Sequence, residues 1–89
     1  MIARELLIIN RLGLHARAAA KLVATASRFS ASIKLQKDGK SADAKSIMAV
    51  MMLAAGKGSH LTVQCDGEDE AASLAAVEAL IQDRFGEDE

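Results

Sequence analysis

The sequence predicts an α+β fold of two layers, with helices on one face of a sheet and solvent on the other. Residues 32–37 and 60–65 alternate apolar and polar side chains, as strands with one wet face do. Three other segments, at 16–29, at 47–55 and after Asp66, read as helices. The order is therefore βαββαβα, joined by short turns, which predicts a single domain over residues 1–89.

The first strand and the first helix carry different signals. Residues 2–9 contain the run LLII, typical of a short strand, and the turn NRLG follows. The helix predicted from Ala16 to Phe29 has an apolar stripe for the core. The stripe consists of Ala19, Leu22, Val23, Ala26 and Phe29. Three side chains outside it, Arg17, Lys21 and Arg28, make one exposed side of this helix basic.

A hairpin and a short helix come next. Residues 32–37 point Ile33 and Leu35 to one face, and Asp38-Gly39 is a strong two-residue hairpin signal before a third strand at 40–44. Ser46 is a good N-cap for a helix over 47–55, which Gly56 would end.

The last strand and helix complete the pattern. Residues 60–65 place Leu61, Val63 and Cys65 inward. The acidic stretch DGEDE suits the positive end of the final helix. The buried side of that helix consists of Leu74, Val77, Leu80, Ile81 and Phe85. The closing GEDE is expected to be a frayed acidic tail.

Composition excludes several classes of function. With 89 residues, a net charge of -1 and one cysteine, we expect a cytoplasmic protein without a disulfide, a signal peptide or a membrane span. The charge argues against nucleic acid as a partner. Cys65 and His60 point to opposite faces of one strand, so we expect no metal site and no cofactor.

The segment GLHARAAAK, residues 13–21, predicts an anion site. No good capping residue precedes the helix, so the N–H groups of Ala16, Arg17 and Ala18 are expected to point outward unpaired. The helix N-terminus is positive, and Arg17 adds a guanidinium suited to phosphate. His15 in this setting is a neutral nucleophile suited to receiving a phosphoryl group, and Gly13 is expected to keep the approach to it open. The alternative is a surface histidine at a helix start.

The second helix predicts a contact surface. It is apolar nearly all round, and a short helix on a two-layer fold cannot bury its whole circumference. We therefore expect some of its large side chains to be exposed, among Ile47, Met48, Met51 and Met52. A small phosphatase-like enzyme and an RNA-binding module share this element order. Only two phenylalanines, both assigned to helices or their ends, argue against RNA stacking.

With His15 and Ser46 placed, the whole chain resembles the HPr family, the histidine-containing phosphocarriers of the bacterial phosphotransferase system. The resemblance rests on LGLHAR around His15, on KSIMAVMMLAAGKG from Lys45 to Gly58, and on the acid-led final helix. It implies an open-faced β-sandwich, a four-stranded antiparallel sheet with three helices on one side. It also implies a carrier, not an enzyme that processes a substrate alone.

The resemblance also implies partners and roles. Enzyme I, charged by phosphoenolpyruvate, would phosphorylate His15 on Nδ1, and a IIA-type protein would accept the group. Arg17 would stabilise the phosphate, helped by the backbone around Ala16 and Ala18. Ser46 matches a position that a dedicated kinase phosphorylates in some bacteria. The docking surface of this expected monomer would consist of Arg17, Ala20, Lys21, Ile47, Met48 and Met51.

One residue departs from the common family pattern. Many members have proline where this chain has Ala18, and alanine restores one N–H near the expected phosphate. With the alanine run, this resembles proteobacterial members, including the nitrogen-related branch called NPr. Both sugar uptake and nitrogen-related regulation stay open.

Overall fold

The computed structural model describes residues 1–89 and has the predicted element order. The four strands are β1 (Ile2–Leu7), β2 (Ser32–Lys37), β3 (Lys40–Asp43) and β4 (His60–Asp66). The helices are α1 (Ala16–Ala26), α2 (Ile47–Met52) and α3 (Glu70–Gln82), followed by a 3-10 turn, η1 (Arg84–Gly86).

The strands form one antiparallel sheet in the order β1-β4-β2-β3. The central strand β4 pairs Cys65 with Ile2 on one side and with Ile33 on the other. The hairpin between β2 and β3 turns at Asp38 and Gly39, both with positive φ, as a two-residue turn requires. The predicted hairpin and sheet are thus confirmed.

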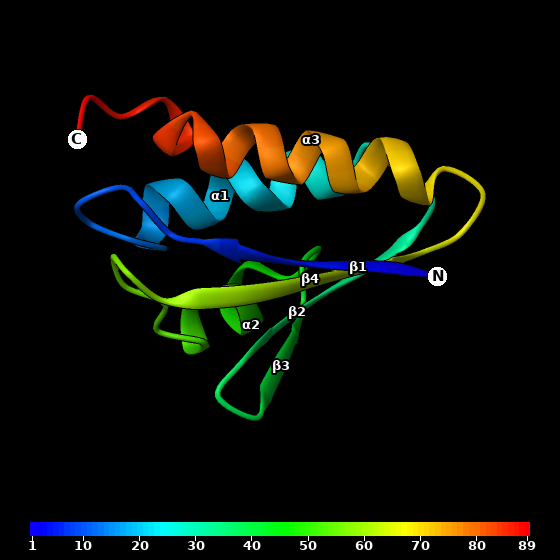
Figure 1. Ribbon diagram of the computed structural model, residues 1–89, viewed down its shortest axis with the longest axis horizontal. Coiled ribbons are helices and arrows are strands. Elements are labelled where there is room, and N and C mark those ends of the chain that lie inside the picture. The colour runs from blue at the N-terminus through cyan, green and yellow to red at the C-terminus, as the bar shows by residue number, and fades with distance from the viewer.

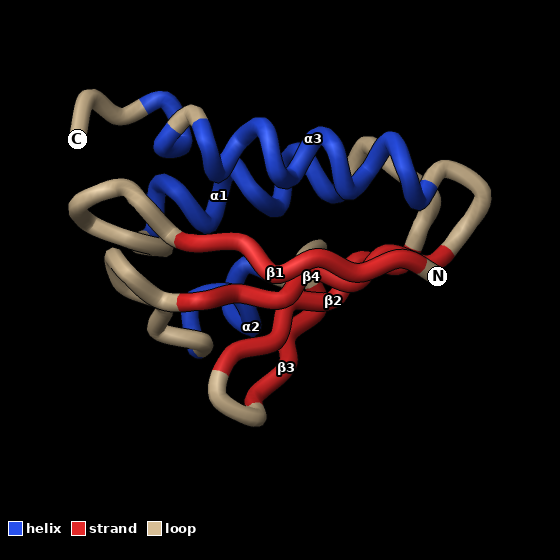
Figure 2. The backbone as a smooth tube through the Cα atoms, viewed as in Figure 1, coloured by secondary structure: helices blue, strands red, loops and turns tan.

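The helices lie along one face of this sheet (Figures 1 and 2). Helices α1 and α3 contact each other, α3 covers β1 and β4, and α2 packs against α1 and β3. The core between the layers includes Leu61, Val63 and Cys65 of β4, as predicted, together with Leu22 of α1 and Val77 of α3. No helix is both long enough and apolar enough to cross a membrane.

Three predicted boundaries are wrong by two or three residues. Strand β1 ends at Leu7, and α1 ends at Ala26, after which Phe29 N–H bonds to the Ala26 carbonyl as a tight turn. Helix α2 ends at Met52, before Gly56, because Ala54 already has a φ of 53°. In each case apolar residues continue past the end of the strand or helix and pack against the core. The apolar pattern in the sequence is therefore longer than the regular element.

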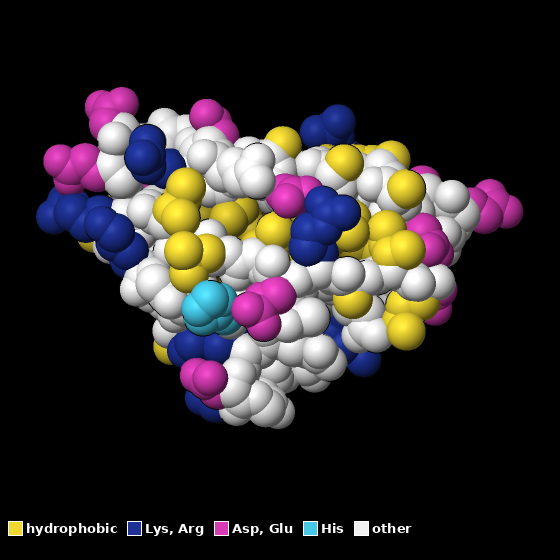
Figure 3. Space-filling model, viewed as in Figure 1, with side chains coloured by type: hydrophobic (Ala, Val, Ile, Leu, Met, Phe, Trp, Pro, Cys, Tyr) yellow, Lys and Arg dark blue, Asp and Glu magenta, His cyan; other side chains and the backbone are white.

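The open face of the sheet carries mixed charges. On it, His60 Nδ1 lies 3.1 Å from Glu5 Oε1. Figure 3 shows basic and acidic side chains interspersed on the visible face, with acidic side chains gathered near the C-terminal end beside basic ones. That end of the molecule holds His15 and Arg17, and its geometry is described next.

Candidate functional site

His15 occupies the N-cap position of α1. Its backbone is extended, with φ of -72° and ψ of 177°, and its carbonyl accepts the first bond of the helix from Ala19 N–H at 2.8 Å. Its ring Nδ1 accepts a hydrogen bond from Arg17 N–H at 3.3 Å. The prediction that Arg17 N–H is unpaired is therefore wrong, because the histidine itself caps the helix.

The other donors of the first turn differ in exposure. Ala16 is exposed and borders the hollow beside His15, so its N–H lies at the open end of α1. Ala18 has no exposed surface, so the prediction that its N–H points outward is wrong: the residue lies inside the core. The backbone N–H groups at the exposed start of α1 are therefore those of Ala16 and Arg17.

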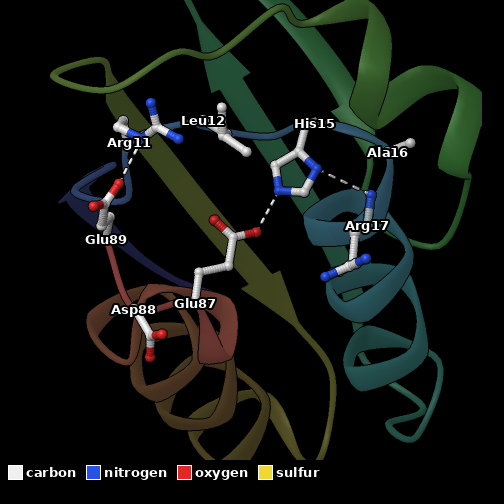
Figure 4. Close-up of a pocket in the computed structure, with 8 residues that line it drawn as sticks. All are labelled: Arg11, Leu12, His15, Ala16, Arg17, Glu87, Asp88 and Glu89. Atoms are coloured by element: carbon white, nitrogen blue, oxygen red, sulfur yellow. Dashed lines mark hydrogen bonds and ion pairs between the residues drawn. The ribbon is translucent and has the colours of Figure 1, made fainter.

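The Arg17 side chain is exposed and forms no ion pair. Figure 4 shows its guanidinium directed along α1 and away from the His15 ring. Arg17 is the second residue of α1, so its exposed side chain begins at the same helix end as His15. A guanidinium with no protein partner keeps its five N–H donors available, and these suit phosphate oxygens.

Gly13 has a different task from the predicted one. Its φ is +65°, and a Cβ there would lie 2.5 Å from the Ala55 carbonyl oxygen and 2.6 Å from Gly56 Cα. The next residue, Leu14, donates its N–H to the same Ala55 carbonyl at 2.8 Å. Gly13 is thus required for packing the loop before α1 against the segment after α2, and the prediction that it keeps the approach to His15 open is replaced by this role.

The C-terminal segment lies against the histidine, so the prediction of a frayed tail is wrong. The Glu87 carboxylate contacts His15 Nε2 through Oε2, and Figure 4 shows the carboxylate pointing at the ring. The His15 side chain is 28% exposed and the Glu87 side chain 16% exposed. Both ring nitrogens of His15 therefore have a partner, one from each end of the chain.

Glu87 is held from several sides. Asn10, fully buried, donates from Nδ2 to Glu87 Oε1 at 3.0 Å and to the Gly13 carbonyl at 2.9 Å. Lys21 Nζ donates to the Phe85 carbonyl at 2.6 Å, and Phe85 is buried in the core. The hydrogen bond from Asn10, followed by that from His15, lowers the pKa of the Glu87 carboxyl, with a smaller effect from the charge of Lys21. The Glu87 carboxylate is accordingly held in place by hydrogen bonds that favour its ionised form.

The last residues close the edge of the site. Arg11 donates its N–H to the Glu89 carbonyl at 2.7 Å, and its Nε lies 2.7 Å from Glu89 Oε2. Between these segments lies an open hollow of about 670 Å³. It is lined by Arg11, Leu12, His15, Ala16, Arg17, Glu87, Asp88 and Glu89 (Figure 4).

An exposed apolar patch lies on α2, as predicted. Ile47 is 40% exposed, Met48 68% and Met51 41%, while Val50 on the opposite side is fully buried. On α1, Ala20 and Lys21 are exposed beside Arg17. Leu12, exposed at the hollow, adds an apolar side chain that no pattern in the sequence indicates. Helices α1 and α2 contact each other, so both groups of side chains belong to neighbouring elements.

Ser46 has the predicted capping role. Its Oγ accepts a hydrogen bond from Ala49 N–H at 3.4 Å at the start of α2, and its side chain is half-buried. Glu87 and Asn10, in contrast, were missed. Asn10 was assigned to a turn, and no pattern distinguishes Glu87 from the other acids of GEDE, because its partner His15 is 72 residues away.

The chain is similar to known proteins over its length. Residues 2–83 match a family described as the phosphotransferase-system HPr component, phosphorylation site. The phosphocarrier protein HPr of Cupriavidus necator is 54% identical over 89 residues, covering all of both chains. The crystal structure of HPr-C-His from Thermoanaerobacter tengcongensis superposes with a TM-score of 0.96, at 42% identity over all of both chains.

A second structure from that organism, described as an HPr dimer, has a TM-score of 0.79 at 44% identity, covering 92% of this chain and 94% of the other. The family match spans both the His15 segment and the α2 segment that carried the resemblance. The relatives are similar over their full length, so the likeness is not confined to one motif. The chain belongs to the HPr family, the phosphocarrier proteins of the phosphotransferase system, which carry a phosphoryl group and do not themselves catalyse a reaction.

Proposed function

We propose that this chain accepts a phosphoryl group on Nδ1 of His15 from Enzyme I charged by phosphoenolpyruvate, and passes it to a IIA-type protein. The observation that carries the proposal is the hydrogen bond from Arg17 N–H to His15 Nδ1, at the exposed start of α1. An N–H can only donate, so Nδ1 holds its lone pair free of a proton. Nδ1 is therefore the nucleophilic nitrogen.

The transfer is a displacement at phosphorus. The Nδ1 lone pair of His15 forms the new N–P bond, while the bond between phosphorus and the donor group of Enzyme I breaks and its electron pair stays with the donor. The group on Nδ1 replaces the Arg17 N–H as the partner of that nitrogen. Its oxygens then lie next to the N–H groups of Ala16 and Arg17, at the positive end of α1.

The weakness of this site suits a carrier. A group that is loaded and unloaded must not be held too tightly, and the site offers an open hollow, two backbone donors and one exposed guanidinium from Arg17. The helix end is worth about 0.3–1 kcal/mol to an exposed anion. Arg17 supplies the larger attraction when its side chain turns to the phosphoryl oxygens, and loses it when the group leaves.

The proposed docking surface serves both partners because His15 must lie at each interface. It combines Arg17, Ala20 and Lys21 of α1 with Ile47, Met48 and Met51 of α2, all of them exposed. Methionines adapt to more than one partner surface. We place the chain in the cytoplasm as a monomer, with Ser46 as the target of a regulatory kinase. Sugar uptake and nitrogen-related regulation are alternative pathways for the same relay.

Label transfer from phosphoenolpyruvate tests the proposal. With catalytic Enzyme I, the wild-type chain should take up one acid-labile, base-stable phosphate and lose it when a IIA-type protein is added. His15→Ala should abolish labelling, whereas His60→Ala, which removes the other histidine on the open sheet face, should leave it unchanged. Labelling of His15→Ala, or a wild-type chain that never labels, would contradict the proposal. Separate mixtures with sugar-type and nitrogen-type IIA proteins decide between the two pathways.

A further inference from the structure

We propose that Glu87 is a positioning residue for phosphoryl transfer: its carboxylate holds the proton of His15 on Nε2 and so keeps Nδ1 as the only free nucleophile of the ring. The inference rests on the proposed function, because it assigns a task to Glu87 within that site. It concerns a residue beyond the segment matched by the family model, which ends at residue 83.

The two partners of the ring fix its tautomer. Arg17 N–H points at Nδ1, which must accept, and the Glu87 carboxylate points at Nε2. An ionised carboxylate can only accept, so Nε2 must carry the hydrogen. The lowered pKa of the Glu87 carboxyl keeps it ionised through the neutral range. The two contacts therefore favour one tautomer, with the hydrogen on Nε2 and the lone pair on Nδ1.

Glu87 is built into the fold, unlike a side chain at the end of a loose tail. Its Oε1 is bound by Asn10, which is itself buried and tied to the Gly13 carbonyl two residues before His15. Phe85, buried in the core and bound at its carbonyl by Lys21, anchors the chain just before Glu87. The carboxylate and the histidine are thus held to the same loop, which fixes their relative orientation.

The carboxylate also matches the charge that develops on the ring. As Nδ1 forms its bond to phosphorus, the ring becomes positive while Nε2 keeps its hydrogen. A carboxylate bound to that N–H stabilises the positive ring, as the orienting carboxylate of a catalytic histidine does. The same contact helps the reverse step, because His15 leaves phosphorus as a ring already protonated at Nε2. One residue can therefore assist both loading and unloading.

The other charged groups around the ring are arranged differently. Arg17 and Lys21 lie on α1, Lys21 being engaged with the Phe85 carbonyl, and Arg11 is paired with Glu89. Asp88 lines the same hollow, is exposed and forms no ion pair. Glu87 alone among these carboxylates contacts His15. Asp83, at the C-terminal end of α3, is exposed, forms no ion pair and lies outside the hollow, so Asp83→Asn is a control that removes the same charge without changing the site.

Nitrogen-15 NMR of the His15 ring tests the tautomer without any phosphoryl transfer. In the full-length wild-type chain at neutral pH we expect a single Nε2–H form whose proton exchanges slowly enough to be observed. Glu87→Gln keeps only one of the two acceptor oxygens that Asn10 and His15 use in the wild type, so it should weaken that signal, whereas Asp83→Asn should retain it. Glu87→Ala should lose it to fast exchange. A wild-type ring protonated on Nδ1, or a signal that survives in Glu87→Ala, would overturn the inference.

Steady-state transfer from Enzyme I tests the consequence. We expect Glu87→Ala to lower kcat on the order of tenfold, by analogy with the loss that follows removal of the hydrogen-bonded partner of a metal-ligating histidine, with little change in KM. Glu87→Gln should give a kcat between these two, because it keeps one acceptor oxygen but lacks the charge, and Asp83→Asn should match the wild type. An unchanged kcat in Glu87→Ala would overturn the positioning role. Failure of the proposed function looks different, since the wild-type chain would then not label at all while its NMR signal persisted.

Discussion

Asp69 lies at the start of a helix, but its side chain binds a distant turn and does not cap that helix. It stands at the N-cap position of α3 but makes no capping hydrogen bond with its side chain. Its carboxylate instead accepts from Ser30 N–H at 2.9 Å and from Ala31 N–H at 2.8 Å. These bonds tie the turn after α1 to the start of α3. The backbone donor of Ser30, then that of Ala31, lowers the pKa of the Asp69 carboxyl.

This lowered pKa makes part of the stability depend on pH. A carboxyl whose pKa is lower in the folded than in the unfolded chain adds stability above its usual pKa of 3.8, and that stability is lost as the pH falls through the folded value. We therefore predict that Asp69→Asn is less stable than the wild type at pH 7, and that the difference shrinks below the usual pKa of aspartate. Urea unfolding at several pH values measures this.

Asp88→Asn provides the comparison, because Asp88 is exposed and forms no ion pair. Its stability should follow the wild type at every pH. A constant difference between wild type and Asp69→Asn down to pH 2 would show that the hydrogen bonds of Asp69 do not depend on its charge.

At the scale of elements, α2 combines a structural cap with a surface. It has only six residues, Ile47–Met52, and a helix this short depends on its cap and its packing. Ser46 supplies the cap, Val50 supplies the buried contact, and Met48 is left 68% exposed. The cap therefore lies beside the side chains proposed to contact Enzyme I, so a charge on Ser46 would interact electrostatically with a bound partner.

Two substitutions at Ser46 separate these effects. Ser46→Ala removes the acceptor for Ala49 N–H and should lower the free energy of unfolding by about 1 kcal/mol, without changing the KM for transfer from Enzyme I. Ser46→Asp keeps a capping oxygen, so its stability should stay close to that of the wild type. Its added negative charge next to the apolar patch should raise the KM severalfold. Unfolding curves and transfer kinetics on both variants test whether Ser46→Ala changes only the stability and Ser46→Asp only the KM. An unchanged KM in Ser46→Asp would show that Ser46 acts only as a helix cap.

Element types were predictable from the sequence because they depend on local patterns. Alternation identified β4, the Asp38-Gly39 pair identified the hairpin, and Ser46 marked the start of α2. Element ends were less predictable. Ala54 adopts a positive φ, which alanine seldom does, so the backbone leaves the helix where the sequence still favours it.

At the scale of the whole molecule, the site is made where two distant parts of the chain meet. The loop from Asn10 to His15 supplies the histidine, and Glu87, near the other end of the sequence, supplies the carboxylate that contacts it. The sequence predicted His15 and Arg17 because their chemistry is local, at one helix start. It could not predict Glu87, because the docking of η1 and the final residues depends on Phe85 entering the core and on Lys21 binding its carbonyl.

The central claim is that Nδ1 of His15 carries the phosphoryl group. The most direct test is phosphorus-31 NMR of the chain, labelled with nitrogen-15 histidine and phosphorylated by Enzyme I and phosphoenolpyruvate. We expect one phosphorus signal coupled to Nδ1 of His15, since Nε2 contacts the Glu87 carboxylate. Coupling to Nε2 of His15, or phosphorus attached to His60 in place of His15, would contradict it.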